Sequence, residues 1–350
     1  MLRVAINGYG RIGRMAHRII LQWHSEEIEV VAINAGSSTD LKGWMYLLKY
    51  DTVYGPLDTD MSINPNTDAV KKDFLGQLVV NNKSISVYSQ KDPTLLPWKD
   101  LNVDLVIEST GHFTTSEKMQ THITAGAKSV VLSAPAKDDT PTYVISVNDD
   151  KYHGEKLVNN ASCTTNCITP VARIIEEAFG IQKAMMTTIH GYTSDQRLQD
   201  GGHKDYRRAR AATENIIPTS TGATIAAGKA LPSLQNKFAG LSIRVPVPVG
   251  SLSDFTFLLN KDVTVEEVNS TLEQAAQQPN YQGVLMTTHD PIVSSDIIGN
   301  SHSSIADLSL TQVVGGNMLK VIAWYDNEYG YANRLVELCL LVGGQLQPSE

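Results

Sequence analysis

The chain has 350 residues, of which 42% are hydrophobic and 19% charged, and its formal net charge at pH 7 is −8. This length allows two domains with sizeable cores, and the acidic balance argues against a dedicated nucleic-acid-binding protein. No apolar run reaches the roughly 18 residues that a membrane-spanning helix needs. Only three cysteines are present and the chain opens directly into a strand, so we expect a cytoplasmic protein without a disulfide framework or signal peptide.

The first predicted elements surround a glycine-rich loop. Leu2–Ile6 and Glu29–Asn34 read as buried strands, and a helix-like segment lies between them. Gly8, Gly10 and Gly13 have the G-x-G-x-x-G spacing. In that motif the first glycine permits the tight turn, the second lets the backbone approach a pyrophosphate, and the third allows close helix–strand packing. The order strand, loop, helix, strand therefore favours a dinucleotide site over a tight turn without a ligand.

Alternation of strands and helices continues through the first half. Strand-like runs at Val103–Ile107 and Ser129–Leu132 flank a helix-like stretch at Ser116–Ala125. Both strands end in loops of small residues, at 108–111 and 133–135. Because such loops line the ligand crevice of an open parallel sheet, we predict a doubly wound α/β domain.

A candidate nucleophile follows. Cys163 lies between two hydroxyl residues, immediately before the helix-like run Ile168–Phe179, and a helix N-terminus favours the thiolate over the thiol. His190 ends the strand-like run Ala184–Ile189 and can supply the base. The structural alternatives are a small buried hydrophobe and a hydrogen-bonded core histidine. Cys167, four residues beyond Cys163, suits neither a zinc site nor a redox pair, so we interpret it as packing and expect no metal.

The second half changes in pattern. Alternating runs at Gly240–Val249, Asp254–Leu259 and Met318–Tyr325 predict a mostly antiparallel sheet, with a helix near Val265–Gln277 and another at the C-terminus. The arginine-rich stretch Thr193–Pro218 is long for a plain connector, which predicts a functional loop.

Taken in order, these motifs resemble those of phosphorylating glyceraldehyde-3-phosphate dehydrogenases over essentially the whole chain. The matching stretches are Ile6–Arg14, Ala161–Cys167, Thr188–Thr193, Arg207–Ala212, Pro218–Ala223, Arg244–Pro246 and Trp324–Glu328. The resemblance implies a Rossmann-type dinucleotide-binding domain over residues 1–162, completed by a C-terminal helix at about 328–350. It also implies an α+β catalytic domain over residues 163–327 and a homotetramer.

The chemistry that the resemblance implies belongs to glycolysis and gluconeogenesis. Cys163 would attack the aldehyde of glyceraldehyde 3-phosphate, and His190 would take the hydroxyl proton as hydride leaves for NAD(P). Inorganic phosphate would then cleave the resulting thioester to 1,3-bisphosphoglycerate. The cofactor contacts implied are Gly8, Gly10, Arg11, Ile12, Gly13, Asn34, Ser109, Thr110, Gly111, Ser133 and Asn327.

Two anion sites are also implied. Thr193 and Arg244 would bind the phosphate of the substrate, and Arg210 would lie near both sites. The attacking phosphate would be bound by Ser162, Thr164, Thr221 and Gly222. Arg207 and Arg208 are interpreted as solvated or as part of a subunit contact.

Two alternatives remain open. An erythrose-4-phosphate dehydrogenase hydrolyses its thioester, and its relatives lack the Thr-Gly pair that stands here as Thr221 and Gly222. A catalytically silent nucleotide-binding scaffold is the alternative of another class, and the intact Cys163, His190 and Asn327 argue against it.

Cofactor choice is where the chain departs from its relatives. Ala35 stands where NAD-using members usually carry an aspartate, whose carboxylate would repel a 2′-phosphate. Gly201 and Gly202 stand where a Leu-Pro pair is common, and they leave room for that phosphate. No basic residue lies between Asn34 and Leu41. We therefore expect NADP preference or dual use, with drift that leaves NAD use strict as the alternative.

Overall fold

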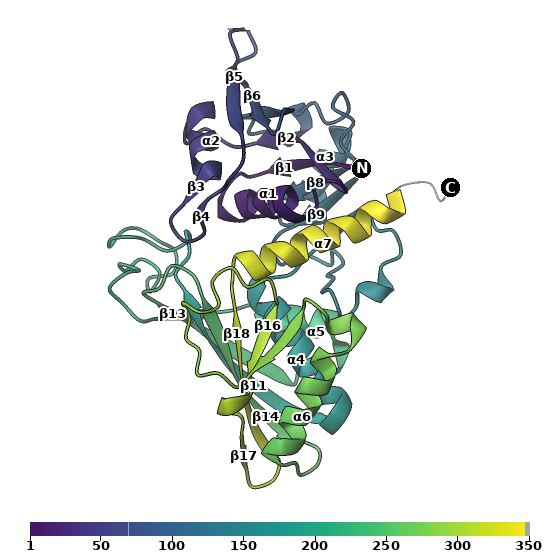
Figure 1. Cartoon of the computed structure of the whole chain (residues 1–350), viewed down its shortest axis with the longest axis vertical. Coiled ribbons are helices and arrows are strands. Elements are labelled where there is room, and N and C mark those ends of the chain that lie inside the picture. Colours follow the sequence, from purple (N-terminus) through teal and green to yellow (C-terminus); the bar gives the residue numbers. More distant parts are fainter. Residues whose placement is uncertain (69, 347–350) are drawn as a thin grey trace. The chain divides into compact units, whose positions relative to one another are not determined.

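The computed structural model of the chain describes residues 1–68 and 70–346 and divides into two compact units (Figure 1). Unit 1 comprises Met1–Tyr143, Tyr152–Ala161 and the chain from Ala332 onward, and unit 2 comprises Val144–Lys151 and Ser162–Tyr331. The predicted ranges did not separate Val144–Lys151 from the first domain. Arg173 explains its place in unit 2, because Nη1 donates hydrogen bonds to the carbonyls of Ser146 at 2.9 Å and Val147 at 2.8 Å.

The sheet of unit 1 has eight strands in the order β10-β9-β8-β1-β2-β7-β6-β5. The strands are β1 Leu2–Asn7, β2 Ile28–Asn34, β5 Met61–Pro65, β6 Phe74–Val80, β7 Lys83–Tyr88, β8 Leu105–Glu108, β9 Ser129–Leu132 and β10 Leu157–Asn159. The run from β10 to β7 is parallel, and β6 and β5 add an antiparallel edge that the sequence patterns did not predict. A separate two-stranded ribbon pairs β3 Tyr50–Asp51 with β4 Gly55–Pro56.

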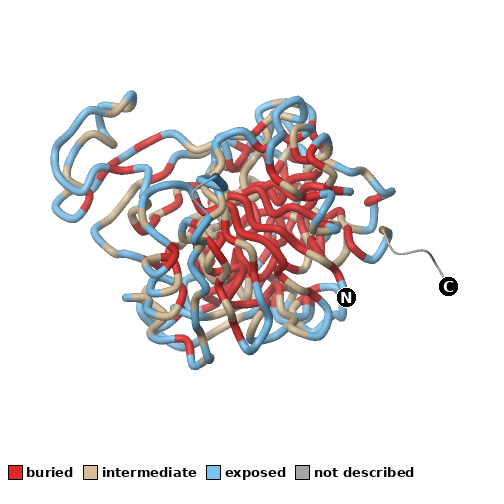
Figure 2. The backbone as a smooth tube through the Cα atoms, turned by 90° about the horizontal axis from the view of Figure 1, so that it is seen from above, coloured by how far each residue is buried: buried red, intermediate tan, exposed pale blue. Residues whose placement is uncertain are grey.

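Helices cover both faces of this sheet. The helices of unit 1 are α1 Arg11–Trp23, α2 Leu41–Lys49, α3 Ser116–Thr124 and most of α7 Tyr329–Leu346. Alternate strand residues point to opposite faces, so Ala5 and Val106 share a core with Met119 of α3, while Ile6 faces Gly13 of α1. The predicted doubly wound parallel sheet is confirmed. Figure 2 shows its central strands as buried.

The sheet of unit 2 is mostly antiparallel, as predicted. Its order is β12-β13-β11-β14-β18-β16-β15, with β17 paired to β18, and only the β11–β13 and β15–β16 pairs are parallel. The strands are β11 Ile181–Gly191, β12 Ile217–Ser220, β13 Phe238–Val245, β14 Ser251–Leu259, β15 Leu285–Thr288, β16 Ser304–Asp307, β17 Gln312–Val314 and β18 Met318–Tyr325.

Three helices pack against the sheet of unit 2 in one core: α4 Cys163–Phe179, α5 Ala223–Ala230 and α6 Val265–Ala276. Along β14 buried residues alternate with half-buried ones, which is the pattern of a strand with one face in the core. The opposite face carries exposed apolar side chains, including Met185 and Leu241.

Short 3-10 helices complete the described chain at Pro93–Leu95, Asp149–Lys151, Pro232–Leu234, Pro279–Tyr281 and Leu308–Leu310. Among residues 1–68 and 70–346, no helix combines the length and hydropathy that crossing a bilayer requires.

Candidate active site

The first turn of α4 positions the candidate nucleophile. Ser162 caps this helix, because its Oγ accepts a hydrogen bond from the Thr165 amide at 3.1 Å. The helix therefore begins at Cys163, five residues before the apolar run from which it was predicted. Removal of a serine cap destabilises a helix by about 1 kcal/mol, which is enough to fix where the helix starts.

Cys163 and His190 meet in unit 2. The Sγ atom lies 3.4 Å from Nε2 of His190, which projects from the C-terminal end of β11. Twenty-seven residues separate the two in sequence. A nucleophile within hydrogen-bond reach of a base is the arrangement that covalent catalysis requires.

Contacts at the far side of the ring determine the tautomer of His190. Its Nδ1 lies 2.6 Å from the Gly191 carbonyl oxygen, which can only accept a hydrogen bond, and 2.9 Å from Nη1 of Arg244, which can only donate. The contact to the carbonyl is the shorter one, and Nη1 has that carbonyl as an acceptor at 3.2 Å, so we assign the proton to Nδ1. Nε2 is then unprotonated and can accept the thiol proton of Cys163.

The electrostatics keep this ring neutral. Burial, and then the nearby positive charge of Arg244, lower the pKa of His190 to about 3, while the hydrogen bond to the Gly191 carbonyl opposes the shift. At pH 7 the imidazole is therefore a neutral base rather than an imidazolium.

The thiol behaves differently from our expectation. Burial raises the pKa of Cys163 above its ordinary value, although the charge of Arg244 and hydrogen bonds from Thr164 lower it. The prediction that the helix N-terminus favours the thiolate of Cys163 is therefore wrong, because the cost of burying the charged sulfur outweighs the effect of the helix. The resting pair is a neutral thiol facing a neutral imidazole.

Tyr325 joins the residues around this pair and was not predicted. Its hydroxyl lies 2.9 Å from Oγ1 of Thr164 and 2.8 Å from Oγ1 of Thr188, and its ring packs edge-on against His190. The Thr164 hydroxyl, which we expected in an anion site, is thus buried against Tyr325. A tyrosine at the end of an apolar strand carries no sequence signal that distinguishes it from core packing.

Two helix N-termini lie side by side near the thiol. Thr165 Oγ1, in the first turn of α4, donates to the carbonyl of Ala223, the first residue of α5, at 3.3 Å. Gly222 caps α5 without a side chain, and Thr221 Oγ1 accepts from the Ala223 amide at 3.1 Å. Main-chain amides at helix starts favour an anion. Ser162, Thr221 and Gly222, which we predicted to bind a phosphate, lie at these two starts.

The arginines divide differently from our interpretation. Arg208 forms an ion pair with Asp195 at 2.6 Å, and its charge helps to lower the pKa values of His190 and Arg244. Arg210 instead pairs with Asp200 at 2.9 Å, and its side chain is 61% exposed. Arg208, which we had interpreted as solvated or as part of a subunit contact, thus lies near the site together with Arg244. Consecutive arginines in an irregular loop carry no period that could have distinguished them.

Thr193, the other residue predicted to bind the substrate phosphate, comes two residues after the end of β11 at Gly191. It is half-buried, and its amide donates to the Gln196 side chain at 3.3 Å.

The glycine loop of unit 1 has the geometry that a pyrophosphate needs. Gly8 has φ +95°, and a Cβ there would lie 2.6 Å from the Thr110 amide nitrogen. A Cβ on Gly13 would lie 2.2 Å from the Gly8 carbonyl oxygen. Gly10 has open space around its Cα and begins α1 with no side-chain cap, so a ligand can approach the first amides of that helix. These residues fit a dinucleotide.

Other predicted cofactor residues turn their side chains toward the protein. Asn34 donates to Asn7 at 2.7 Å and to the Gln90 carbonyl at 2.9 Å. Ser109 Oγ donates to the Gly8 carbonyl at 2.7 Å. Arg11, on α1 beside Ile12, forms an ion pair with Asp51 at 2.8 Å.

Main-chain features distinguish two further predicted positions in unit 1. Gly111 has φ +74°, and the Ser133 amide donates to the Glu108 carbonyl at 2.9 Å. In unit 2, the side-chain oxygen of Asn327 accepts from the Gly250 amide at 3.1 Å and from the Ser251 hydroxyl at 2.9 Å, which fixes the orientation of its amide.

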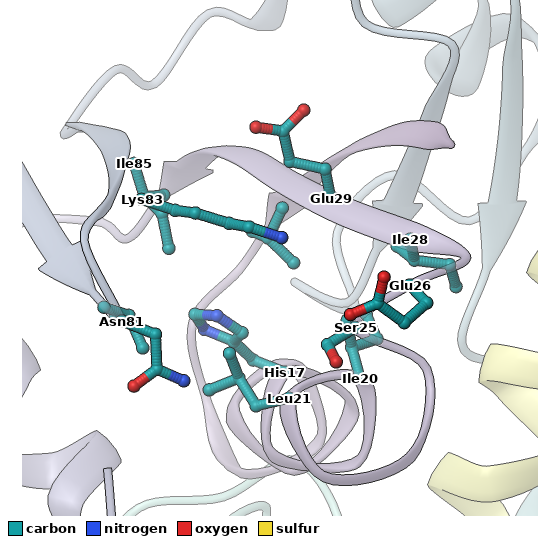
Figure 3. Close-up of a pocket in the computed structure, with 12 residues that line it drawn as sticks. His17, Ile20, Leu21, Ser25, Glu26, Ile28, Glu29, Asn81, Lys83 and Ile85 are labelled. Carbon is teal, nitrogen blue, oxygen red and sulfur yellow. The ribbon is translucent and has the colours of Figure 1, made fainter. Parts of the chain in front are cut away.

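A separate cavity of about 220 Å³ lies in unit 1 between α1, β2 and the β6–β7 hairpin (Figure 3). His17 lines it, with Nδ1 2.6 Å from the Tyr9 hydroxyl, and burial lowers the pKa of His17 to about 3. The other lining residues include Glu26 and Glu29 but no cysteine. Within the described ranges, no group of three or more His, Cys, Asp or Glu side chains is placed to hold a metal ion.

Comparison with known proteins agrees with this geometry. Residues 2–116 match the family model described as "Glyceraldehyde 3-phosphate dehydrogenase, NAD binding domain", and residues 162–327 match "Glyceraldehyde 3-phosphate dehydrogenase, C-terminal domain". The chain belongs to the glyceraldehyde-3-phosphate dehydrogenase family. It is 48% identical over 347 residues to "Glyceraldehyde-3-phosphate dehydrogenase 2" of Streptomyces avermitilis. It is 48% identical to "Glyceraldehyde-3-phosphate dehydrogenase" of Streptomyces coelicolor and 47% identical to that of Mycolicibacterium smegmatis. In each case the match covers 99% of both chains.

Proposed function

We propose that this member of the family is an NAD(P)-dependent enzyme that oxidises glyceraldehyde 3-phosphate and transfers the acyl group to inorganic phosphate. The observation that carries the proposal is the pair of Cys163 Sγ and His190 Nε2 at 3.4 Å, with the proton of the ring held at Nδ1 by the Gly191 carbonyl. The relatives named for this activity, which match along the whole chain, support the same reading.

In the first half of the reaction Cys163 forms a bond to the aldehyde carbon. Its sulfur adds to the carbonyl, and Nε2 of His190 passes the thiol proton to the carbonyl oxygen, which gives a thiohemiacetal. Nε2 then takes the hydroxyl proton back as the carbonyl of a thioester forms. The nicotinamide ring of the bound cofactor supplies the hydride acceptor for this oxidation. In the second half a phosphate oxygen attacks the thioester carbon, and Cys163 leaves as a thiolate. The thiolate then takes back the proton that Nε2 of His190 holds.

Substrate binding makes the neutral pair reactive. Burial, and after it the positive charge of Arg244, lower the pKa of His190, so the ring is a weak base. A substrate phosphate bound by Arg244 and Thr193 offsets that charge, which brings the pKa of His190 back toward its ordinary value. We propose that Arg208 shares this phosphate, and that Ser162, the main-chain amide of Thr164, Thr221 and Gly222 bind the attacking phosphate at the starts of α4 and α5.

We further propose that NADP is preferred or used alongside NAD. Ala35 leaves no carboxylate to repel a 2′-phosphate, and its amide donates to the Tyr88 carbonyl at 2.8 Å. Because Gln90 also donates to the Asn34 side chain at 2.9 Å, the turn after β7 lies beside the end of β2. This turn continues into the exposed Lys91, a cation that the residues between Asn34 and Leu41 do not supply.

We also propose a homotetramer in a cytoplasmic setting. The open face of the unit 2 sheet exposes Met185 and Leu241, and the long loop that follows β11 exposes Leu198 and Tyr206, so apolar surface is available to partner subunits. All three cysteines are free thiols, as is usual in a reducing compartment.

The test is a steady-state assay with glyceraldehyde 3-phosphate, with and without inorganic phosphate, using NAD and NADP in turn. We expect turnover that requires phosphate and forms an acyl phosphate. Turnover that does not depend on phosphate would instead indicate thioester hydrolysis, and absence of turnover with either cofactor would indicate a silent relative.

A further inference from the structure

Glu108 is a fully buried acid at the C-terminal end of β8 that lies outside the chemistry described above. Four donors surround its carboxylate. One oxygen accepts from the amide of Thr110 at 2.8 Å and from the hydroxyl of the same residue. The other accepts from Nδ2 of Asn7 at 2.5 Å and from Nε2 of His122 at 3.1 Å. A carboxylate offers about four acceptor positions, so its capacity is used completely.

The proton on His122 is placed by its other neighbour. Trp98 Nε1 donates to Nδ1 of His122 at 3.1 Å, so Nδ1 is an acceptor and the proton resides on Nε2, directed at Glu108. Trp98 and His122 are both fully buried and their rings stack. The network therefore extends from the crevice edge of the sheet into the core beneath α3.

The same network joins three strand ends. Asn7, Asn34 and Glu108 are the last residues of β1, β2 and β8 and lie side by side in register. Asn7 Oδ1 accepts from Asn34 Nδ2 at 2.7 Å, and Asn34 bonds in turn to the main chain of Gln90. In an open parallel sheet the ligand crevice lies outside these carboxyl ends.

Movement of this network would reach the glycine loop directly. The Thr110 amide that Glu108 holds is the atom that a Cβ on Gly8 would approach to 2.6 Å, so the two segments are in close contact. Ser109 Oγ also donates to the Gly8 carbonyl at 2.7 Å. An acid buried among hydrogen-bond donors adds little stability that an apolar side chain could not provide. The role of Glu108 is instead to fix the positions of Thr110 and Asn7.

We infer that Glu108 is a positioning residue for cofactor binding, which sets the geometry of the crevice through Thr110 and Asn7 without touching the cofactor. The inference rests on the dinucleotide occupying the crevice of unit 1, and it is independent of which nicotinamide cofactor is preferred. Both cofactors share this crevice, so loss of Glu108 should weaken NAD and NADP to the same degree.

The test is Glu108→Gln, with equilibrium dialysis of NAD and of NADP against the folded enzyme and steady-state kinetics alongside. Glutamine has the shape of glutamate, but its amide nitrogen can only donate. Two positions that accept hydrogen bonds in Glu108 would therefore become donors that face other donors. We expect the Kd of each cofactor to rise about tenfold, because a buried hydrogen bond is lost. The ratio of the two Kd values and the KM for glyceraldehyde 3-phosphate should stay unchanged, and kcat at saturating cofactor should stay within about twofold.

Glu176→Gln is the matched control. That glutamate accepts from the Ile181 amide in unit 2, at the end of α4 remote from Cys163, so the same substitution should lower stability without changing cofactor Kd. Thr110→Val is the milder variant if Glu108→Gln does not fold. It removes one of the four donors, and we expect a smaller rise in both Kd values.

Wild-type Kd values in folded Glu108→Gln, or in Thr110→Val where the former does not fold, would overturn the inference. So would an equal loss of cofactor affinity in Glu176→Gln. Failure of the NADP proposal would be seen in a different measurement, because the wild-type enzyme would then prefer NAD.

Discussion

The crevice edge of unit 1 and the thiol site of unit 2 use their polar side chains in opposite ways. At the crevice edge Asn34, Ser109 and Glu108 bond to the protein itself, which leaves main-chain amides and open glycines to face a ligand. At the thiol site Cys163 and His190 bond to each other beside a cation, so the side chains carry the chemistry. The comparison teaches that changes in unit 1 should alter affinity, whereas changes in unit 2 should alter rate.

The strongest test of the rate side is Cys163→Ser. A serine hydroxyl is hardly ionised near neutrality, so kcat should fall by about 10⁴-fold or more while the cofactor Kd and the thermal midpoint stay near wild type. Measurable turnover close to the wild-type rate would show that the nucleophile lies elsewhere.

His190→Asn should have the next largest effect. Loss of the proton acceptor should lower kcat by roughly 10²–10⁴-fold. It should also slow alkylation of Cys163 by iodoacetamide near pH 7, because Nε2 no longer accepts the thiol proton at 3.4 Å. Alkylation rates that match wild type across pH 6–9 would mean that the two side chains are not coupled.

Arginine variants sharpen the picture of the anion sites. Arg244→Leu removes the charge that lowers the pKa values of both Cys163 and His190, so both should rise and the alkylation profile should move to higher pH. The KM for glyceraldehyde 3-phosphate should rise about tenfold or more in Arg244→Leu and in Arg208→Leu. Arg210→Leu serves as the comparison, because Arg210 pairs with the exposed Asp200 and this variant should stay near wild type. A larger loss in Arg210→Leu than in Arg208→Leu would restore the original assignment.

On the affinity side, Ala35→Asp tests cofactor choice. A carboxylate there should repel the 2′-phosphate and accept from a ribose hydroxyl, so the ratio of kcat/KM for NADP to that for NAD should fall about ten- to hundredfold. Lys91→Gln should shift the ratio in the same direction by less. An unchanged ratio in both variants, or a wild type that strongly prefers NAD, would contradict the proposal.

A separate expected effect, on stability instead of rate or affinity, appears at acid pH. Burial lowers the pKa of His17 to about 3, so the folded state binds no proton there while the unfolded state does below about pH 6.5. The free energy of unfolding should therefore fall as pH drops from 6.5 toward 3, with a contribution of about 1.4 kcal/mol per pH unit from this histidine. In urea titrations at several acid pH values, the slope of the unfolding free energy against pH should be smaller in His17→Gln by the equivalent of about one proton. An identical slope in the two proteins would mean that His17 is not buried in its neutral form.

Local patterns predicted most of the fold because its elements are strongly periodic. The runs Ser129–Leu132 and Met318–Tyr325 are strands with the predicted bounds, and the glycine loop lies between a strand and a helix as expected. The start of α4 was predicted too far along the chain, because the prediction used the periodic apolar residues and not the capping residue Ser162. The β5–β6 edge was missed because half-exposed strands with interspersed polar residues resemble loops.

The site was harder to predict where it depends on distant partners. Cys163 and His190 stood out because a motif surrounds each of them. The partners of Glu108 lie 101 residues before it and 14 after it, so nothing in the local sequence indicates that its carboxylate is buried. The pKa of Cys163 was misjudged for a similar reason: the helix start can be predicted from neighbouring residues, whereas burial depends on the whole core of unit 2.

The place of α7 in unit 1 bears on how the chain is made. From Ala332 onward this helix belongs to unit 1, and its Gly343 lies so close to Leu2 of β1 that an added Cβ would come within 2.6 Å of that side chain. On the ribosome, the first strand is therefore synthesised long before the helix that covers it, with nearly all of unit 2 emerging in between. The nascent chain must hold an incomplete nucleotide-binding unit until α7 has emerged, a period in which its uncovered apolar surface is available to chaperones.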